Sequence, residues 1–80
     1  MPEEELFKSE EEIERREIAE ALRDAADQIE SGDVTLASGA EERTASIPDR
    51  ARFEVELERL TDSETGAQRL ELEYEIRWTE

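Results

Sequence analysis

Strict two-residue alternation of apolar and charged side chains near the C-terminus constrains the fold of this chain more than any other feature. Between Arg69 and Trp78, apolar residues take every second position, and glutamates and arginines fill the positions between them. Because successive side chains on a strand point to opposite faces, this stretch predicts a β-strand with one apolar and one charged face. The apolar residues are Leu70, Leu72, Tyr74, Ile76 and Trp78.

A second alternating stretch, Arg52–Arg59, predicts the partner of that strand. Between the two lies Asp62–Gly66, which is rich in residues that favour turns, so the strands are expected to form a hairpin. Two registers suit the loop and keep both apolar sets on one face, and they place Phe53 opposite Tyr74 or Ile76. Leu60 falls out of phase with the apolar positions before it, which a bulge or the strand end would explain.

Helical periodicity is confined to the N-terminal half of the chain. The apolar stripe predicts a helix over Arg15–Ser31, which Gly32 would end. A capping-box pattern at Ser9 and Glu12 would start the helix earlier, but Ile13 lies off the stripe and favours the later start, with Glu14 near the N-cap. Ile13 and Ile18 would then be the two ends of a hydrophobic staple. The stripe consists of Ile18, Leu22, Ala25, Ala26 and Ile29.

Three weaker strands complete the predicted sheet. Leu6–Glu12 is expected to be an edge strand, Asp33–Ser38 a short strand after the helix, and Arg43–Ile47 a strand that Pro48 closes. The predicted fold is α+β, with a single helix packed on an antiparallel β-meander of four to five strands in the order β-α-β-β-β-β. Residues 1–5 would be an acidic lead-in, and residues 6–80 a single domain.

Charge says more about the environment of the chain than about its chemistry. The formal net charge is −15, from 25 acidic and 10 basic residues, and only Lys8 among the basic residues is lysine. Such a chain repels itself at ordinary ionic strength, and molar salt screens that repulsion because the Debye length falls to about 3 Å. Because the charge is spread along the whole chain, we expect a protein adapted to a salt-accumulating cytoplasm in preference to an acidic mesophilic domain.

The chain lacks residue types on which several classes of protein depend. The chain has no cysteine and no histidine, which removes disulfides, thiolate metal sites and the commonest general base. No apolar run approaches the roughly 20 residues that cross a bilayer, and the acidic N-terminus is unlike a signal peptide. We therefore expect a cytoplasmic protein without a cofactor, a membrane association or an enzymatic activity.

The whole pattern resembles the amphi-Trp domain, a small family frequent in salt-loving archaea. The resemblance covers nearly the whole chain and implies the predicted fold and a saline environment, but no established activity. Family members often have Ser or Thr at the helix start, where this chain has Glu14. The residues that carry the resemblance are Leu6-Phe7, Arg16-Glu17-Ile18-Ala19, Leu22, Ala25-Ala26-Asp27, Glu30-Ser31-Gly32, Val34, Leu36, Ile47-Pro48-Asp49 and the alternating strand that ends at Trp78.

The charged face of the predicted hairpin is the first candidate site. Glutamates face glutamates across the two strands in either register, and like charges directly opposite one another destabilise a sheet. Clustered carboxylates can bind hard cations, although a specific site needs ligands that converge, usually from a loop. A solvated acidic face that meets solvent cations at high salt is therefore preferred to a metal site. The candidates are Glu54, Glu56, Glu58, Glu71, Glu73 and Glu75.

Tyr74 and Trp78 are the second candidate, as an interaction surface. Aromatic side chains on a sheet stack bases in some RNA-binding folds, but these two share a face with leucines and would more often pack in a core. No basic patch is evident, so nucleic acid is disfavoured. The leading hypothesis is a non-catalytic interaction or structural module that binds a protein partner or self-associates. The alternatives are a cation-binding acidic protein and a weakly nucleic-acid-associated module.

Overall fold

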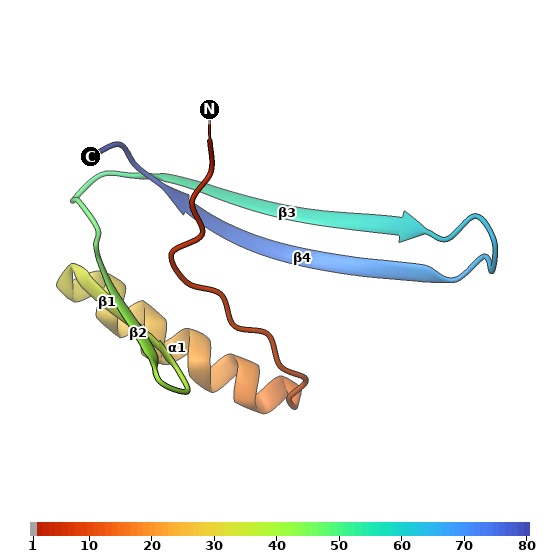
Figure 1. Ribbon diagram of the computed structural model, residues 1–80, viewed down its shortest axis with the longest axis horizontal. Coiled ribbons are helices and arrows are strands. Elements are labelled where there is room, and N and C mark those ends of the chain that lie inside the picture. The colour runs from red at the N-terminus through yellow and green to blue at the C-terminus, as the bar shows by residue number, and fades with distance from the viewer. Residues whose placement is uncertain (1) are drawn as a thin grey trace. The chain divides into compact units, whose positions relative to one another are not determined.

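A computed structural model describes residues 2–80, which contain one helix followed by four strands (Figure 1). The chain divides into two compact units at Asp49 and Arg50. The first unit holds α1 (Arg15–Ser31), β1 (Asp33–Ser38) and β2 (Glu41–Ser46), and the second holds β3 (Arg52–Thr61) and β4 (Gln68–Arg77). The α+β class is confirmed.

The prediction of one continuous meander is wrong. In residues 2–80 the strands form two separate antiparallel pairs, β1 with β2 and β3 with β4. The physical reason lies in the composition of β2, which has Ala45 as its only apolar side chain and so offers no apolar row that would continue the apolar face of β3. The expectation of a single domain over residues 6–80 stays a prediction.

Helix α1 has the predicted bounds. Glu14 is the N-cap in an extended conformation, with φ −73° and ψ 151°, and makes no side-chain capping bond. Gly32 ends the helix at φ 104°, a left-handed conformation that glycine adopts without the steric cost of a Cβ. Its N–H donates to the carbonyls of Gln28 and Ile29, at 3.1 and 3.0 Å, which satisfies part of the helix end.

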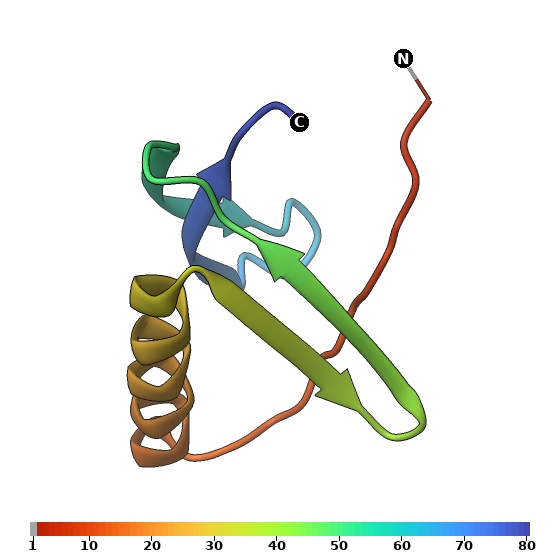
Figure 2. The same ribbon diagram turned by 90° about the vertical axis from the view of Figure 1, so that its left-hand side faces the viewer.

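The β1–β2 hairpin follows directly from Gly32 (Figure 2). Its two-residue turn places Gly39 at φ 59° in the first central position, as a type II′ turn requires. The hydroxyls of Thr35 and Thr44 lie 3.2 Å apart in a directly opposed pair, and the Ser46 hydroxyl donates to Asp33 at 2.8 Å. Compared with the predicted strand Arg43–Ile47, β2 begins two residues earlier, at Glu41, and ends one residue earlier, at Ser46.

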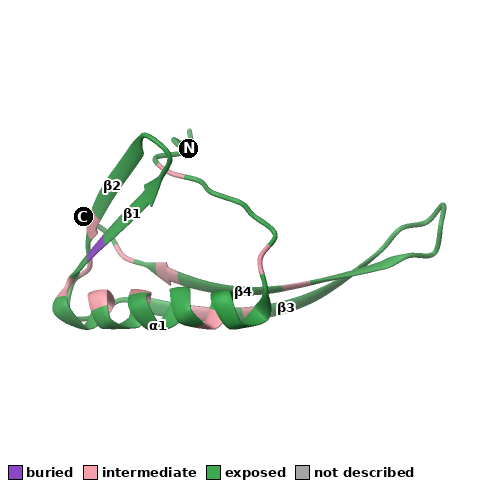
Figure 3. Cartoon of the chain, turned by 90° about the horizontal axis from the view of Figure 1, so that it is seen from below, coloured by how far each residue is buried: buried purple, intermediate pink, exposed green. Residues whose placement is uncertain are grey.

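The core of the first unit is very small. Val34 on β1 is the one buried side chain among residues 2–80, and α1 buries none of its own (Figure 3). Hydrogen bonds also link the helix to the hairpin: the N–H of Thr35 donates to the side-chain oxygen of Gln28 at 2.8 Å, and the N–H of Ile47 to the carbonyl of Gly32 at 2.7 Å. The helix is thereby tied to the hairpin by hydrogen bonds at its C-terminal end.

The predicted edge strand Leu6–Glu12 is wrong. The segment has neither strand nor helix structure. Beyond Phe7 its side chains are Lys, Ser and three successive glutamates, so it has no alternating apolar face with which to join a sheet. Its carbonyl at Leu6 accepts a hydrogen bond from the Arg43 side chain at 3.2 Å, which positions the segment beside β2 without a backbone ladder.

The β3–β4 hairpin is closed by a loop built on Asp62. The Asp62 carboxylate accepts hydrogen bonds from the N–H groups of Glu64 and Thr65, at 2.8 and 3.3 Å. Gly66 adopts φ 75°, and its N–H donates to the Asp62 carbonyl at 2.8 Å. This side-chain-to-backbone bonding explains why the predicted turn forms here, and it helps to fix the register of β3 and β4, which the loop joins.

Candidate functional site

The register of the β3–β4 hairpin sorts its side chains onto two chemically opposite faces. Phe53 lies opposite Ile76 and Val55 opposite Tyr74, which is one of the two predicted registers. The pairing runs without a bulge to Thr61, so Leu60 sits in regular register opposite Arg69, on the charged face. The apolar row of the other face consists of Phe53, Val55, Leu57, Leu70, Leu72, Tyr74 and Ile76.

The apolar row is exposed along most of its length. Leu57 is 70% exposed, Phe53 63% and Leu72 59%, and Figure 3 shows both strands almost entirely in the colour of exposed residues. Only Ile76, at the open end of the hairpin, is half-buried. A two-stranded hairpin is at best marginally stable in water, and this hairpin leaves its apolar face uncovered within its own unit.

The two aromatic candidates differ in their surroundings. Tyr74 is 55% exposed and stacks on Phe53, with ring centroids 6.1 Å apart and planes inclined by 8°. Trp78 lies just beyond the end of β4 and is half-buried beside a shallow hollow that Arg52 and Ile76 also line. Tyr74 therefore belongs to the exposed apolar row, and Trp78 to its edge.

The opposite face carries a glutamate row, in which like charges pair directly. Glu54 faces Glu75, Glu56 faces Glu73, and Glu58 faces Glu71 across the two strands. Directly opposed side chains in an antiparallel pair have Cβ atoms roughly 5 Å apart, so each pair is repulsive in dilute solution. The structure therefore places all six predicted carboxylates on one surface.

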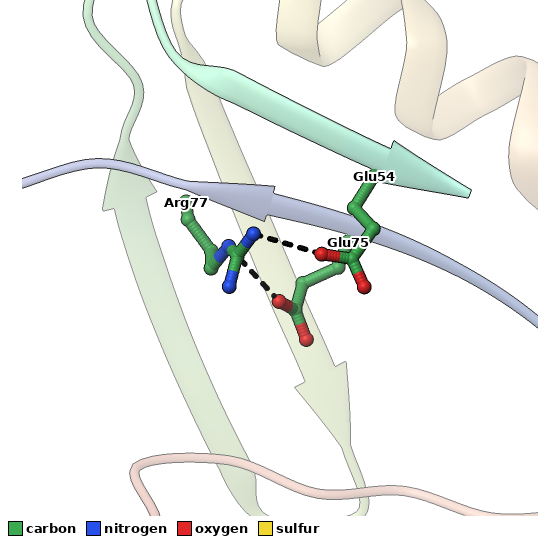
Figure 4. Close-up of polar contacts among 3 residues, drawn as sticks. All are labelled: Glu54, Glu75 and Arg77. Atoms are coloured by element: carbon green, nitrogen blue, oxygen red, sulfur yellow. Dashed lines mark hydrogen bonds and ion pairs between the residues drawn. The ribbon is translucent and has the colours of Figure 1, made fainter. Parts of the chain in front are cut away.

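Among the described residues, arginines form ion pairs only at the ends of the glutamate row, and Figure 4 shows the end at Arg77. Arg77 Nη2 lies 2.8 Å from an oxygen of Glu54, and its Nε lies 3.2 Å from an oxygen of Glu75. At the other end, Arg69 Nε lies 3.3 Å from Glu71. In the described part of the chain, no ion pair reaches the central pair, Glu56 and Glu73, or Glu58, which lies opposite Glu71.

The crowding of the central carboxylates changes the proton affinity of Glu56. A hydrogen bond with Glu58 and the negative charge of that neighbour are the largest causes, followed by partial desolvation and the charges of Glu54 and Glu73. Together they raise the pKa of Glu56 from 4.5 to about 7. At neutral pH this side chain is therefore about half protonated, which relieves some of the repulsion in the row.

The glutamate row does not form a chelating geometry. Among residues 2–80, no three carboxylates converge in a way that could hold a metal ion. The cause is geometric, because carboxylates on a strand surface stand side by side instead of pointing toward a common centre. The association of the row with solvent cations at high salt stays a prediction.

Two features of the hairpin were not anticipated from the sequence. The predicted registers placed Phe53 opposite Tyr74 or Ile76, but its aromatic stack with Tyr74 was not predicted. Arg77 was expected only as a charged residue between two apolar ones, yet it bridges Glu54 on the neighbouring strand and Glu75 on its own. Both follow from the observed register, which brings Phe53 diagonally beside Tyr74 and Arg77 beside Glu54.

In a comparison with known protein families, residues 1–80, the whole chain, match the Amphi-Trp domain. The chain belongs to the Amphi-Trp domain family. Neither the curated proteins nor the solved structures contain a match to it. For this Amphi-Trp domain, no helix among the described residues is long and apolar enough to span a membrane.

We expect the stability of the β3–β4 hairpin to fall as the pH rises from about 5 to 8. Folding favours protonated Glu56, because its pKa is about 7 in the fold and near 4.5 when the chain is unfolded. The stabilisation is present below the unfolded pKa and is lost as the pH passes through the folded pKa. Thermal unfolding followed by circular dichroism tests this cleanly, since the chain has no histidine to titrate in the same window.

The matched variant is Glu56→Gln, which cannot ionise. It should be more stable than the wild-type chain at pH 8 and should lose most of the pH dependence between pH 5 and 8. Carboxyl ¹³C shifts measured by NMR would locate the titration directly. A Glu56 pKa near 4.5 in the folded chain would contradict the proposed crowding.

Proposed function

We propose that this Amphi-Trp domain is a small, non-catalytic protein-interaction or structural module that binds through the apolar row of β3 and β4. The observation that carries the proposal is the exposure of this row, in which Leu57, Phe53 and Leu72 are each about three-fifths exposed or more. Contiguous apolar surface of this kind on a small domain is typical of interaction sites.

The extent of the apolar row supports this reading. Six of its side chains are between 53% and 70% exposed. At roughly 150–200 Å² for a whole side chain of this size, they present on the order of 600 Å² of apolar surface. That is at the upper end of the range of the largest patches on monomeric proteins, roughly 300–600 Å², which are themselves often functional.

A non-catalytic role agrees with the chemistry of the hairpin. The raised pKa of Glu56 is the kind of perturbation that marks catalytic carboxylates, but here its causes are the neighbouring glutamates. The side chain stands among other glutamates on a strand face, which is a flat surface unlike the concave sites that position substrates. The structural origin of the shift therefore supports a charged surface in preference to a general acid.

We also infer that the module is adapted to high ionic strength. The support is the glutamate row, whose three like-charged pairs face one another directly while arginines reach only its ends. Molar salt shortens the Debye length to about 3 Å, below the spacing of the paired carboxylates, and so screens them from one another. The row then keeps the charged face hydrated while the apolar row binds.

Site-specific photo-crosslinking tests the interaction. A photo-reactive amino acid at Leu57 on the apolar row should give adducts with protein when the domain is expressed in a host with a saline cytoplasm. The matched control is the same amino acid at Glu56, the adjacent position on the opposite face. Adduct yield should be about tenfold higher at Leu57, because a buried interface holds its partner in contact. Equal yields at the two positions, or none at Leu57, would contradict the proposal.

Salt dependence tests the inferred adaptation. Far-ultraviolet circular dichroism should show the β-sheet signal decreasing as salt is lowered from molar to millimolar concentration, because the paired glutamates are then unscreened. A double variant, Glu56→Gln with Glu73→Gln, removes the central pair and should depend less on salt. Unchanged spectra across the whole salt range would overturn the inference of a high-salt environment.

A further inference from the structure

We propose that the apolar row is covered by the apolar row of a second copy of this chain, which makes a symmetric dimer with the two β3–β4 hairpins packed face to face. This inference rests on the proposed function and names the partner. The row is the same surface on both copies, so the contact would be isologous, as is usual in two-fold symmetric dimers.

The area of the row fits one copy of itself. On the order of 600 Å² of exposed apolar surface per hairpin approaches the roughly 800 Å² per partner that standard stable interfaces bury. Ile76 and Trp78 at the open end, both half-buried, extend the surface beyond the most exposed residues. A face of this size, two strands wide and ten residues long, is matched in dimensions by another such hairpin.

The distribution of side chains along the row is also self-complementary. The aromatic stack of Phe53 and Tyr74 lies toward one end, and Leu57 and Leu72 lie opposite one another further along. In an antiparallel two-fold arrangement, the aromatic end of each copy would lie over the leucine end of its partner. Val55 lies next to the centre of the row and would therefore lie close to the two-fold axis.

Charge is arranged so that the dimer is compatible with an acidic chain. The glutamate row is on the opposite face of the same hairpin, so face-to-face packing directs it outward on both copies. One charged side chain, that of Arg59 opposite Leu70, does lie on the same face as the apolar row, and it is basic where the glutamate row is acidic. Each copy nevertheless carries a net charge of −15, so the association should weaken as salt is removed.

Two measurements on the full chain test the dimer. Light scattering after size exclusion in molar salt should give twice the mass of one chain, and the dissociation constant should rise by about tenfold or more between molar and 0.1 M salt. Single-cysteine variants then locate the interface, because the natural chain has no cysteine. Val55→Cys should be joined to its partner copy by a short bis-maleimide, and Glu56→Cys, on the opposite face, should not.

The outcomes separate this inference from the proposed function. A folded wild-type chain that stays monomeric at high concentration overturns the dimer. If Leu57 photo-adducts then contain other proteins, the interaction module stands without self-association, and if there are no adducts, both proposals fail. A dimer in which Glu56→Cys crosslinks and Val55→Cys does not would overturn the face-to-face interface. Because the mass is measured on the wild-type chain, the test does not depend on the folding of a variant.

Discussion

The apolar face that the β3–β4 hairpin leaves uncovered within its own unit is the constraint on which the rest of the structure depends. A two-stranded sheet has no second layer of its own, so an alternating sequence on both strands necessarily presents one apolar face to whatever lies next to it. In this chain the register places Phe53 opposite Ile76 and Val55 opposite Tyr74, and so collects the apolar side chains on a single face. Val34 is the one buried side chain among residues 2–80, so these residues form no large core that includes this apolar face.

The same register that creates the apolar row creates the glutamate row. Because side chains alternate between the two faces, one register fixes the pairs on both of them: if Val55 lies opposite Tyr74, then Glu56 must lie opposite Glu73. The electrostatic cost of the charged face is thus coupled to the organisation of the apolar one. Arg77 and Arg69 relieve the ends of the row, while proton uptake by Glu56 and screening by salt relieve its centre.

Elements whose signal is local could be predicted from the sequence. The helix over Arg15–Ser31, its stop at Gly32 and the first short strand have the predicted bounds, because a stripe of apolar residues and a left-handed glycine act within a few residues. The hairpin register was reduced to two choices by the need to keep both apolar sets on one face. The choice between the two registers depends on the six-residue loop, because the hydrogen bonds of Asp62 set how many residues the turn contains.

Features that depend on long-range pairing could not be predicted in this way. Leu6–Glu12 was predicted to be a strand because the helix was expected to start after Ile13, but a strand also needs a partner edge, and the segment forms no ladder. The single meander failed for a similar reason, since apolar alternation shows that strands exist and not which of them pair. At the candidate site, the opposed glutamates followed from the sequence in either register, whereas the bridge from Arg77 to Glu54 required the observed one.

Amide hydrogen exchange across β3 and β4, measured in molar salt at several protein concentrations, tests most directly whether another chain covers the apolar row. If it does, the amides of this hairpin should exchange at least about a hundredfold more slowly than those of an unstructured chain, and dilution should speed their exchange. Exchange near the unstructured rate at every concentration would show a bare hairpin. Slow exchange that dilution does not change would show that the row is covered within its own chain, and either result would contradict the dimer.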